Sequence, residues 1–171
     1  MAAAAGKPPR RPVKGQGCSS ATPDAASGVL ARTVGFHIAR AAVVAYAAFD
    51  EHIGQPHDLR KVDFSLLMLL QEQGPMAPKR LVRLLALTPP KLSMVMERLQ
   101  QRELIRREPD PADRRSVRAS LTAQGRGLVQ SLVPVARTME QELLKRLSVA
   151  EHAQLIGLLD KLAGIEAPAE I

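Results

Sequence analysis

Two adjacent arginines, Arg114 and Arg115, offer distinctive chemistry in this sequence because two carboxylates stand within a turn of them. Asp110 and Asp113 precede the pair in the stretch REPDPADRRSVRASLT, residues 107–122. One carboxylate can hold one guanidinium through two parallel hydrogen bonds, which leaves the other arginine available for an anion. A narrow, A·T-rich DNA minor groove concentrates the negative potential that attracts it. We expect Arg115 at the tip and Asp113 as its positioning group. The alternative is a structural turn in which the aspartates neutralise both arginines.

The sequence on either side of this turn predicts two short strands. Residues 104–107 read Leu-Ile-Arg-Arg, and residues 117–121 alternate, with the side chains of Val117, Ala119 and Leu121 on one face. A strand, a charged turn and a strand predict a β-hairpin. Its candidate contact residues are Asp113, Arg114, Arg115 and Ser116.

Two short helical patterns precede the hairpin. Leucines recur at helical steps from near Pro78 to Leu87, and Thr88 then fits an N-cap. Pro89 follows at the first helical position, where its missing N–H has no consequence. A helix, a short turn and a second helix predict a helix-turn-helix, and a hairpin attached to one is a wing. The expected buried stripe of the second helix is Leu92, Val95, Met96 and Leu99.

Further helices are predicted before this region. Apolar residues at three- and four-residue steps predict a helix over residues 29–53, ended by Gly54 and Pro56. Asp63 fits the N-cap of an apolar helix that ends at Gly74. Because this helix is apolar over most of its circumference, we expect it to be central.

Two helices are also predicted after the hairpin. Thr122 fits the N-cap of a long helix that Pro134 would bend. Ser148 and Glu151 form a capping box that opens the last helix. The sequence therefore predicts a mainly α-helical fold with one small β-hairpin. The expected apolar positions of these two helices are Leu128, Leu132, Val135, Met139, Leu143 and Leu147, and then Leu155, Leu158, Leu159 and Leu162.

The positive charge is concentrated in two places. The formal net charge is +7, of which residues 1–28 carry +3 and residues 77–120 carry +6, while the remainder carries −2. A local basic patch indicates a polyanionic partner such as nucleic acid, and the alternative is a solvated basic surface. Residues 1–28 are rich in Pro, Gly, Ala and Ser without periodicity, so we expect a disordered basic arm.

Composition and motifs argue against several other classes of protein. No apolar stretch approaches the roughly 18 residues of a membrane span, and a signal peptide is not recognised. The single Cys18 cannot form an internal disulfide, so we expect a reducing cytoplasm and no redox sensing. Residues 50–58, DEHIGQPHD, match no metal-ligand spacing and are expected to form an ordinary loop. Neither a metal nor a cofactor is expected, and no enzymatic motif is present.

The stretch ELIRREPDPADRRSVRASLTAQGRGLV resembles the wing of the MarR family (multiple antibiotic resistance regulators). That family has an Asp-x-x-Asp-Arg-Arg turn followed by Leu-Thr-x-x-Gly, and the resemblance covers roughly residues 30–163. It implies a winged-helix homodimer in which the recognition helix, about residues 88–102, enters a major groove and the wing enters the adjacent minor groove. The matching positions are Asp110, Asp113, Arg114, Arg115, Leu121, Thr122 and Gly125.

The resemblance also implies a domain organisation. Residues 29–165 would form one winged-helix domain, followed by a tail at residues 166–171. Within this domain residues 62–121 would be the DNA-binding lobe, and residues 29–56 and 122–165 would be the dimerisation helices.

The recognition helix would contact DNA through its exposed face. There we expect Thr88, Pro90, Lys91, Met94 and Arg98. N–H groups in its first turn would favour phosphate, and Lys79 and Arg80, which open the preceding helix, would also contact phosphates. Two residues depart from the family. Glu103 replaces a usual Gly, which loses a favourable left-handed cap. Met94 replaces a common basic residue, which favours thymine-methyl or shape readout over a guanine contact.

The four aromatic residues cluster near the N-terminal end of the expected folded part. In the MarR family, effectors are generally held between the dimerisation helices and the DNA-binding lobe. The resemblance thus implies a pocket for a small aromatic acid, whose carboxylate Arg40 would pair, with core packing as the alternative. The candidate pocket residues are Phe36, His37, Arg40 and Phe64.

Together these features indicate a cytoplasmic, sequence-specific, dimeric repressor of the MarR type. It would bind a pseudo-palindromic operator in double-stranded DNA and be released by a small ligand such as a phenolic or aromatic acid. The alternative is an architectural or constitutive DNA-binding protein that shares the fold and has no effector site.

Overall fold

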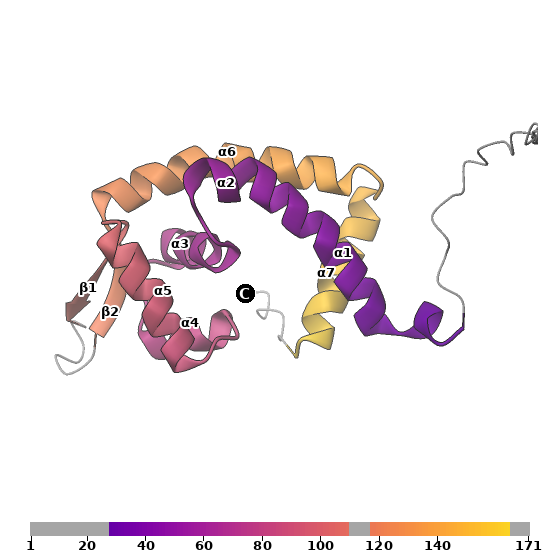
Figure 1. The fold of residues 1–171 in the computed structure, drawn as a ribbon, viewed down its shortest axis with the longest axis horizontal. Helices are drawn as coiled ribbons and strands as arrows, with labels where there is room; N and C mark the ends of the chain where they lie inside the picture. The colour runs from indigo at the N-terminus through magenta and orange to yellow at the C-terminus, as the bar shows by residue number, and fades with distance from the viewer. Residues whose placement is uncertain (1–27, 110–116, 165–171) are drawn as a thin grey trace, which may run out of the picture. The chain divides into compact units, whose positions relative to one another are not determined.

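The computed structural model describes residues 28–109 and 117–164 (Figure 1). They form helices and a two-stranded antiparallel hairpin, which confirms the predicted mainly α-helical class. The chain divides into two compact units, residues 1–38 and 39–171. Within the two described stretches, no helix is both long enough and apolar enough to cross a membrane.

The first helical region does not end at Gly54 and Pro56, so that prediction is wrong. A short 3-10 turn, Leu30–Arg32, precedes α1, Val34–Phe49. A π-helical turn and α2, Gln55–His57, then continue the helical path. Pro56 lies in the first turn of α2, where a missing N–H is tolerated.

The stretch expected to be an ordinary loop is therefore mostly helical. The π-helical turn occupies Asp50–Gly54, and Asp58 ends α2 in the left-handed conformation with φ 48°. Ile53 is fully buried, so this segment packs on the core as a helix would. Its end brings the backbone carbonyls of His57 and Asp58 within reach of Arg102, the C-cap of α5.

Helix α3 spans Lys61–Gln73 and begins two residues before the predicted N-cap. Arg60 is the N-cap, and Asp63 occupies the third helical position, from which its Oδ2 accepts the Arg60 N–H at 2.9 Å. A carboxylate fits both places by sequence, because it can cap from the N-cap or reach back from the third position. The predicted end at Gly74 is confirmed, with φ 75°. So is the central location, since α3 contacts α5, α6 and β2.

Helices α4, Pro78–Leu84, and α5, Pro89–Gln101, form the predicted helix-turn-helix. The turn contains Ala86 in the left-handed conformation, with φ 50°, and α4 ends before the expected Leu87. Thr88 is the N-cap of α5, as predicted. The expected stripe on α5 is buried throughout; it consists of Leu92, Val95, Met96 and Leu99.

Strands β1, Ile105–Pro109, and β2, Val117–Leu121, pair antiparallel, which confirms the predicted hairpin. A backbone bridge joins β2 to the α3–α4 connection: Met76 N–H donates to Ala119 O at 3.0 Å, and Ala119 N–H donates back at 2.8 Å. The alternation in β2 is only partly right, because Val117 is 42% exposed and Ser120 is buried. Val117 is the terminal residue of β2, beyond the reach of the core.

The two helices after the hairpin begin at the predicted caps. For α6, Ala123–Leu144, Thr122 Oγ1 accepts the Gly125 N–H at 2.9 Å. For α7, Val149–Leu162, Ser148 N–H donates to Glu151 Oε2 at 2.8 Å and completes the capping box. These bonds from Ser148 lower the pKa of the Glu151 carboxyl below its usual value. Pro134 lies inside α6.

The end of α5, the start of β1 and the start of α6 meet at Leu104. Its N–H donates to Leu99 O at 2.9 Å, and Glu103 N–H donates to Gln100 O at 2.8 Å, which is a Schellman ending of α5. Glu103 has φ 56°, so this position keeps the left-handed conformation without the expected Gly. Leu104 O accepts the Thr122 N–H at 3.1 Å.

Gly125 lies against this junction, and a side chain there is expected to disrupt it. An alanine Cβ at Gly125 would stand 1.9 Å from Leu104 O, which is a backbone atom already bonded to Thr122. Gly125→Ala should therefore destabilise the larger unit by about 3 kcal/mol or more, as overpacking against backbone does. Thermal unfolding followed by circular dichroism measures this loss.

Gly127→Ala is the matched control on the same helix. A Cβ at Gly127 meets nothing within 4 Å, so this change should stabilise the protein by about 0.5–1 kcal/mol through helix propensity. Equal midpoints for the two variants would contradict the close approach at Gly125.

Candidate nucleic-acid interface

Helix α5 turns one face to the core and the opposite face to solvent. With 100° between successive residues, the side chains opposite the buried stripe are Pro90, Met94, Glu97 and Gln101. All four are exposed, and Met94 is 68% exposed. Of the residues predicted to contact DNA, Pro90 and Met94 lie on this outer face. Thr88, the N-cap, and Lys91, in the first turn, are also exposed.

The first turn of α5 has fewer free N–H donors for a phosphate than the sequence predicts. The Thr88 side chain makes no capping hydrogen bond, and Pro89 and Pro90 have no N–H to donate. The Leu92 N–H is bonded to Thr88 O at 3.0 Å. Lys91 therefore supplies the backbone donor of this turn as well as its cation.

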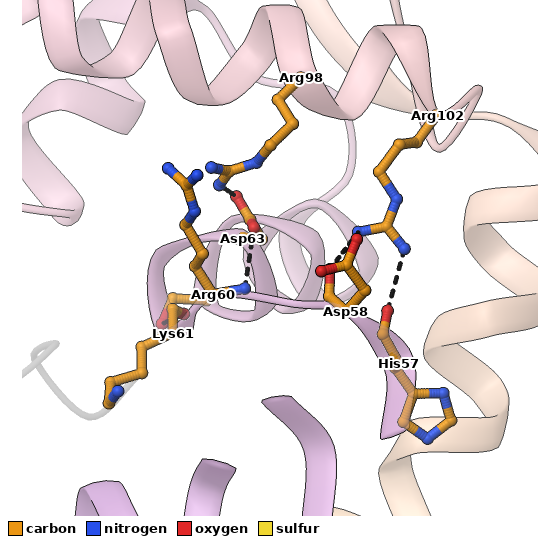
Figure 2. A network of polar contacts seen from close by, with 8 residues as sticks. His57, Asp58, Arg60, Lys61, Asp63, Arg98 and Arg102 are labelled. Carbon is orange, nitrogen blue, oxygen red and sulfur yellow. Dashed lines mark hydrogen bonds and ion pairs between the residues drawn. The ribbon is translucent and has the colours of Figure 1, made fainter. Parts of the chain in front are cut away.

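Arg98 differs from the other predicted contacts because an acid in the interior holds it. Its guanidinium donates to Asp63 Oδ1 (Figure 2). The Asp63 side chain is 0% exposed and that of Arg98 is 24% exposed. Within the described residues, Arg98 Nε is buried and has no hydrogen-bond partner. Since neither charge is fully hydrated, each depends strongly on the other.

A second arginine, the C-cap of α5, stands one turn beyond Arg98 at the same end of the helix. Arg102 Nη2 donates to His57 O at 2.9 Å, and Nη1 donates to the carbonyl of Asp58 (Figure 2). Arg98 and Arg102 stand four residues apart and hence on the same side of the helix. They attach α5 to the start of α3 and to the end of α2.

Sequence reasoning missed this arrangement. It treated Asp63 as a cap, Arg98 as a DNA contact, and His57 and Asp58 as parts of a loop. One signal was present: Asp63 is a carboxylate beside the apolar run of α3. A second was the spacing of Arg98 and Arg102. Neither identifies the partner, because Asp63 and Arg98 are separated by 35 residues.

Basic residues also lie on α4 and on the hairpin. Lys79 and Arg80 are both exposed at the start of α4, and Arg80 Nη2 donates to Gln73 Oε1 at 2.6 Å. A groove of about 410 Å³ between α4, α5 and the hairpin has Lys79 and Arg107 in its lining. On the hairpin, Arg118 Nη2 donates to Pro75 O at 3.1 Å. These cations give the α4–α5–hairpin surface its positive charge.

The predicted wing contacts lie outside the described residues. They are Asp113, Arg114, Arg115 and Ser116, together with Asp110. The strands that flank them are in place on both sides, with Pro109 opposite Val117. Strand β1, which precedes this segment, contacts α5 (Figure 1).

The four predicted effector residues belong to two units. In residues 28–38, the rings of Phe36 and His37 pack edge to face at 5.7 Å, and His37 Nε2 lies 2.9 Å from Ala31 O. In the larger unit, Arg40 is exposed and Phe64 packs edge to face on Phe49 at 5.7 Å. The shared pocket stays a prediction.

Comparison with known proteins gives consistent similarities. The MarR family model matches residues 59–117. The HTH-type transcriptional repressor NicR of Pseudomonas putida is 30% identical over 126 residues, which are 74% of this chain and 80% of NicR.

Two solved structures are also similar. BpsR of Bordetella bronchiseptica, whose DNA binding is regulated by 6-hydroxynicotinic acid, is 31% identical with a TM-score of 0.73; the match covers 84% of this chain and 100% of that one. A mutant of MarR from E. coli, solved with operator DNA, is 24% identical with a TM-score of 0.70 over 80% of this chain and 99% of that one. The second likeness concerns the fold alone.

Loss of Arg98 is expected to harm stability more than loss of Asp63. Arg98→Met leaves a carboxylate with no exposed surface and without its guanidinium, which should cost about 3–5 kcal/mol. Asp63→Asn keeps an acceptor for the Arg60 N–H, and Arg98 can turn toward solvent, so about 1–3 kcal/mol is expected. Denaturant unfolding measures both.

Lys91→Ala is the control on the same helix, because Lys91 is exposed; its unfolding midpoint should match that of the wild type. The double variant Asp63→Asn with Arg98→Met should recover part of the loss seen in Arg98→Met. Wild-type stability of Arg98→Met would show that the pair does not hold α5.

Proposed function

The chain belongs to the MarR family of transcriptional regulators, and we propose that it is a dimeric, sequence-specific repressor that a small aromatic acid releases from its operator. The observation that carries this proposal is the exposed outer face of α5, held by two arginine contacts, with the hairpin beside it. The similarity to NicR, which is a repressor, supports repression and not activation. The protein would act on chromosomal DNA in the cytoplasm.

In this proposal each α5 lies in a major groove and each wing in the adjacent minor groove. Thr88, Pro90, Lys91 and Met94 would face the major groove. Lys79 and Arg80 would contact phosphates, which position the protein without reading sequence. Asp113, Arg114, Arg115 and Ser116 would form the wing contacts. We assign Arg98 to the positioning of α5, because its guanidinium is already bonded to Asp63.

A second copy of this chain would cover apolar surface that is exposed in one copy. On α7 the predicted leucines are all exposed: Leu155, Leu158, Leu159 and Leu162. In residues 28–38 the exposed apolar side chains are Val29, Leu30, Val34 and Ile38. An amphipathic helix that leaves its apolar face to water gains stability when another surface covers that face. Exposed leucine stripes of this kind support the proposal that a second copy of the chain packs here.

The dimer makes a direct prediction for α7. Leu158→Glu with Leu162→Glu places charges on the exposed apolar face and should shift the protein from dimer to monomer in multi-angle light scattering. Gln154→Glu adds a charge at a polar position of the same helix and should leave the dimer intact. A monomeric wild-type protein would overturn the proposal.

The wing makes a second prediction, measured on duplexes selected from a random pool or taken from DNA flanking its own gene. Arg115→Ala should weaken binding by about 1–3 kcal/mol while dimer and fold are unchanged. Wild-type binding should fall steeply as salt rises, because phosphate contacts release counterions. Equal DNA affinities for the variant and the wild type would contradict the assignment of Arg115 as the DNA contact at the wing tip.

The effector makes a third prediction. BpsR responds to 6-hydroxynicotinic acid, so this acid and related phenolic or aromatic acids form the test set. We expect one of them to raise the thermal midpoint and to release DNA in gel shifts. Arg40→Ala should abolish both responses. An unchanged response in Arg40→Ala would rule out the proposed pocket of Phe36, His37, Arg40 and Phe64. If no acid gave a response, a constitutive DNA-binding protein would be favoured.

A further inference from the structure

The outer face of α5 has an unusual composition for a helix that reads DNA. Its four residues are apolar, apolar, acidic and amide: Pro90, Met94, Glu97 and Gln101. Guanine presents two acceptors in the major groove, N7 and O6, and arginine or lysine is the side chain that commonly reads them. An acidic side chain such as Glu97 is an acceptor and cannot do so.

The arginines at the end of α5 are both engaged elsewhere. Arg98 donates to the buried Asp63, and Arg102, the C-cap, donates to the carbonyls of His57 and Asp58 (Figure 2). To read guanine, Arg98 would have to leave a carboxylate that has no exposed surface. Lys91 remains, but it stands to one side of the outer face, in the first turn.

Met94 lies at the middle of the outer face and is 68% exposed. Pro90 is one turn earlier on the same side, so the two form a continuous apolar surface. A single exposed apolar residue on a protein surface needs no explanation. An exposed methionine next to a proline, at the centre of the face that would enter the major groove, calls for a role in DNA binding.

The apolar feature that the major groove presents to a protein is the C5-methyl group of thymine. Resting on the function proposed above, we infer that α5 reads thymine methyl groups through Met94 with Pro90 beside it, and that this contact sets the preference of each half-site for thymine. The unbranched thioether side chain adapts its shape to such a contact. A wing in the minor groove, as proposed above, would not contact these methyl groups, because they lie in the major groove.

Replacement of thymine by deoxyuridine tests this inference because it removes the methyl group and keeps the base pair. A duplex selected by the full-length protein from a random pool is resynthesised with deoxyuridine at one thymine at a time. At the contacted position, wild-type affinity should fall about fourfold, the value of one buried methyl group. Substitution at the contacted thymine of both half-sites should lower the affinity about fifteenfold.

Met94→Ala should bind the thymine duplex more weakly and should no longer distinguish it from the deoxyuridine duplex. Ser93→Ala, an exposed neighbour on another side of α5, is the control and should keep the wild-type ratio. Met94→Ala should unfold at the wild-type midpoint, because its side chain is outside the core.

The outcomes separate this inference from the function on which it rests. If the protein selects no duplex over random DNA, the proposed function fails. If it selects duplexes but binds the thymine and deoxyuridine forms equally at every position, the methyl readout is wrong. A ratio that persists in Met94→Ala would contradict the inference, because another residue would then make the methyl contact.

Discussion

The buried carboxylate of Asp63 is the constraint on which the candidate DNA-binding surface depends. Without exposed surface it needs a donor from the protein, and it has two, the Arg60 N–H and the guanidinium of Arg98. The first bond sets where α3 begins and the second sets how α5 lies on it. The apolar stripe alone would allow α5 to slide or rotate slightly, since hydrophobic contact is non-directional. The ion pair, with Arg102 one turn further along, gives the C-terminal end of α5 a defined orientation.

A backbone junction carries this orientation into the rest of the larger unit. Leu104 accepts from Thr122, donates to the last turn of α5 and has Gly125 directly against it. The end of α5, the first strand of the hairpin and the start of α6 are therefore joined at one place. Because α6 is itself one of the helices proposed to dimerise, a displacement of α6 would move the end of α5 and the start of β1 with it.

The elements were predictable where a local pattern decides them. The stripe of α5, the caps at Thr122 and Ser148 and the two strands follow from periodicity and from hydrogen bonds within a few residues. Prediction failed where two local rules compete. Gly54 and Pro56 stop many helices, but a π turn and a new first turn accommodate them here. Asp63 can cap a helix from two positions, and burial beside Arg98 selects the third position. The wing contacts and the effector pocket remain predictions.

By itself the sequence determined the fold class, the helix-turn-helix with its hairpin, the side of α5 that faces the core and the resemblance that led to the family. These features depend on residue spacing along the chain, which needs no knowledge of distant neighbours. Only the tertiary structure decided which cations are committed to the protein, because Asp63 meets Arg98, and the His57 and Asp58 carbonyls meet Arg102, across long separations in sequence. Burial of Asp63 then makes the Arg98 pairing costly to exchange for DNA. The pairing with Asp63 therefore keeps Arg98 from supplementing the outer face, whose residues are Pro90, Met94, Glu97 and Gln101.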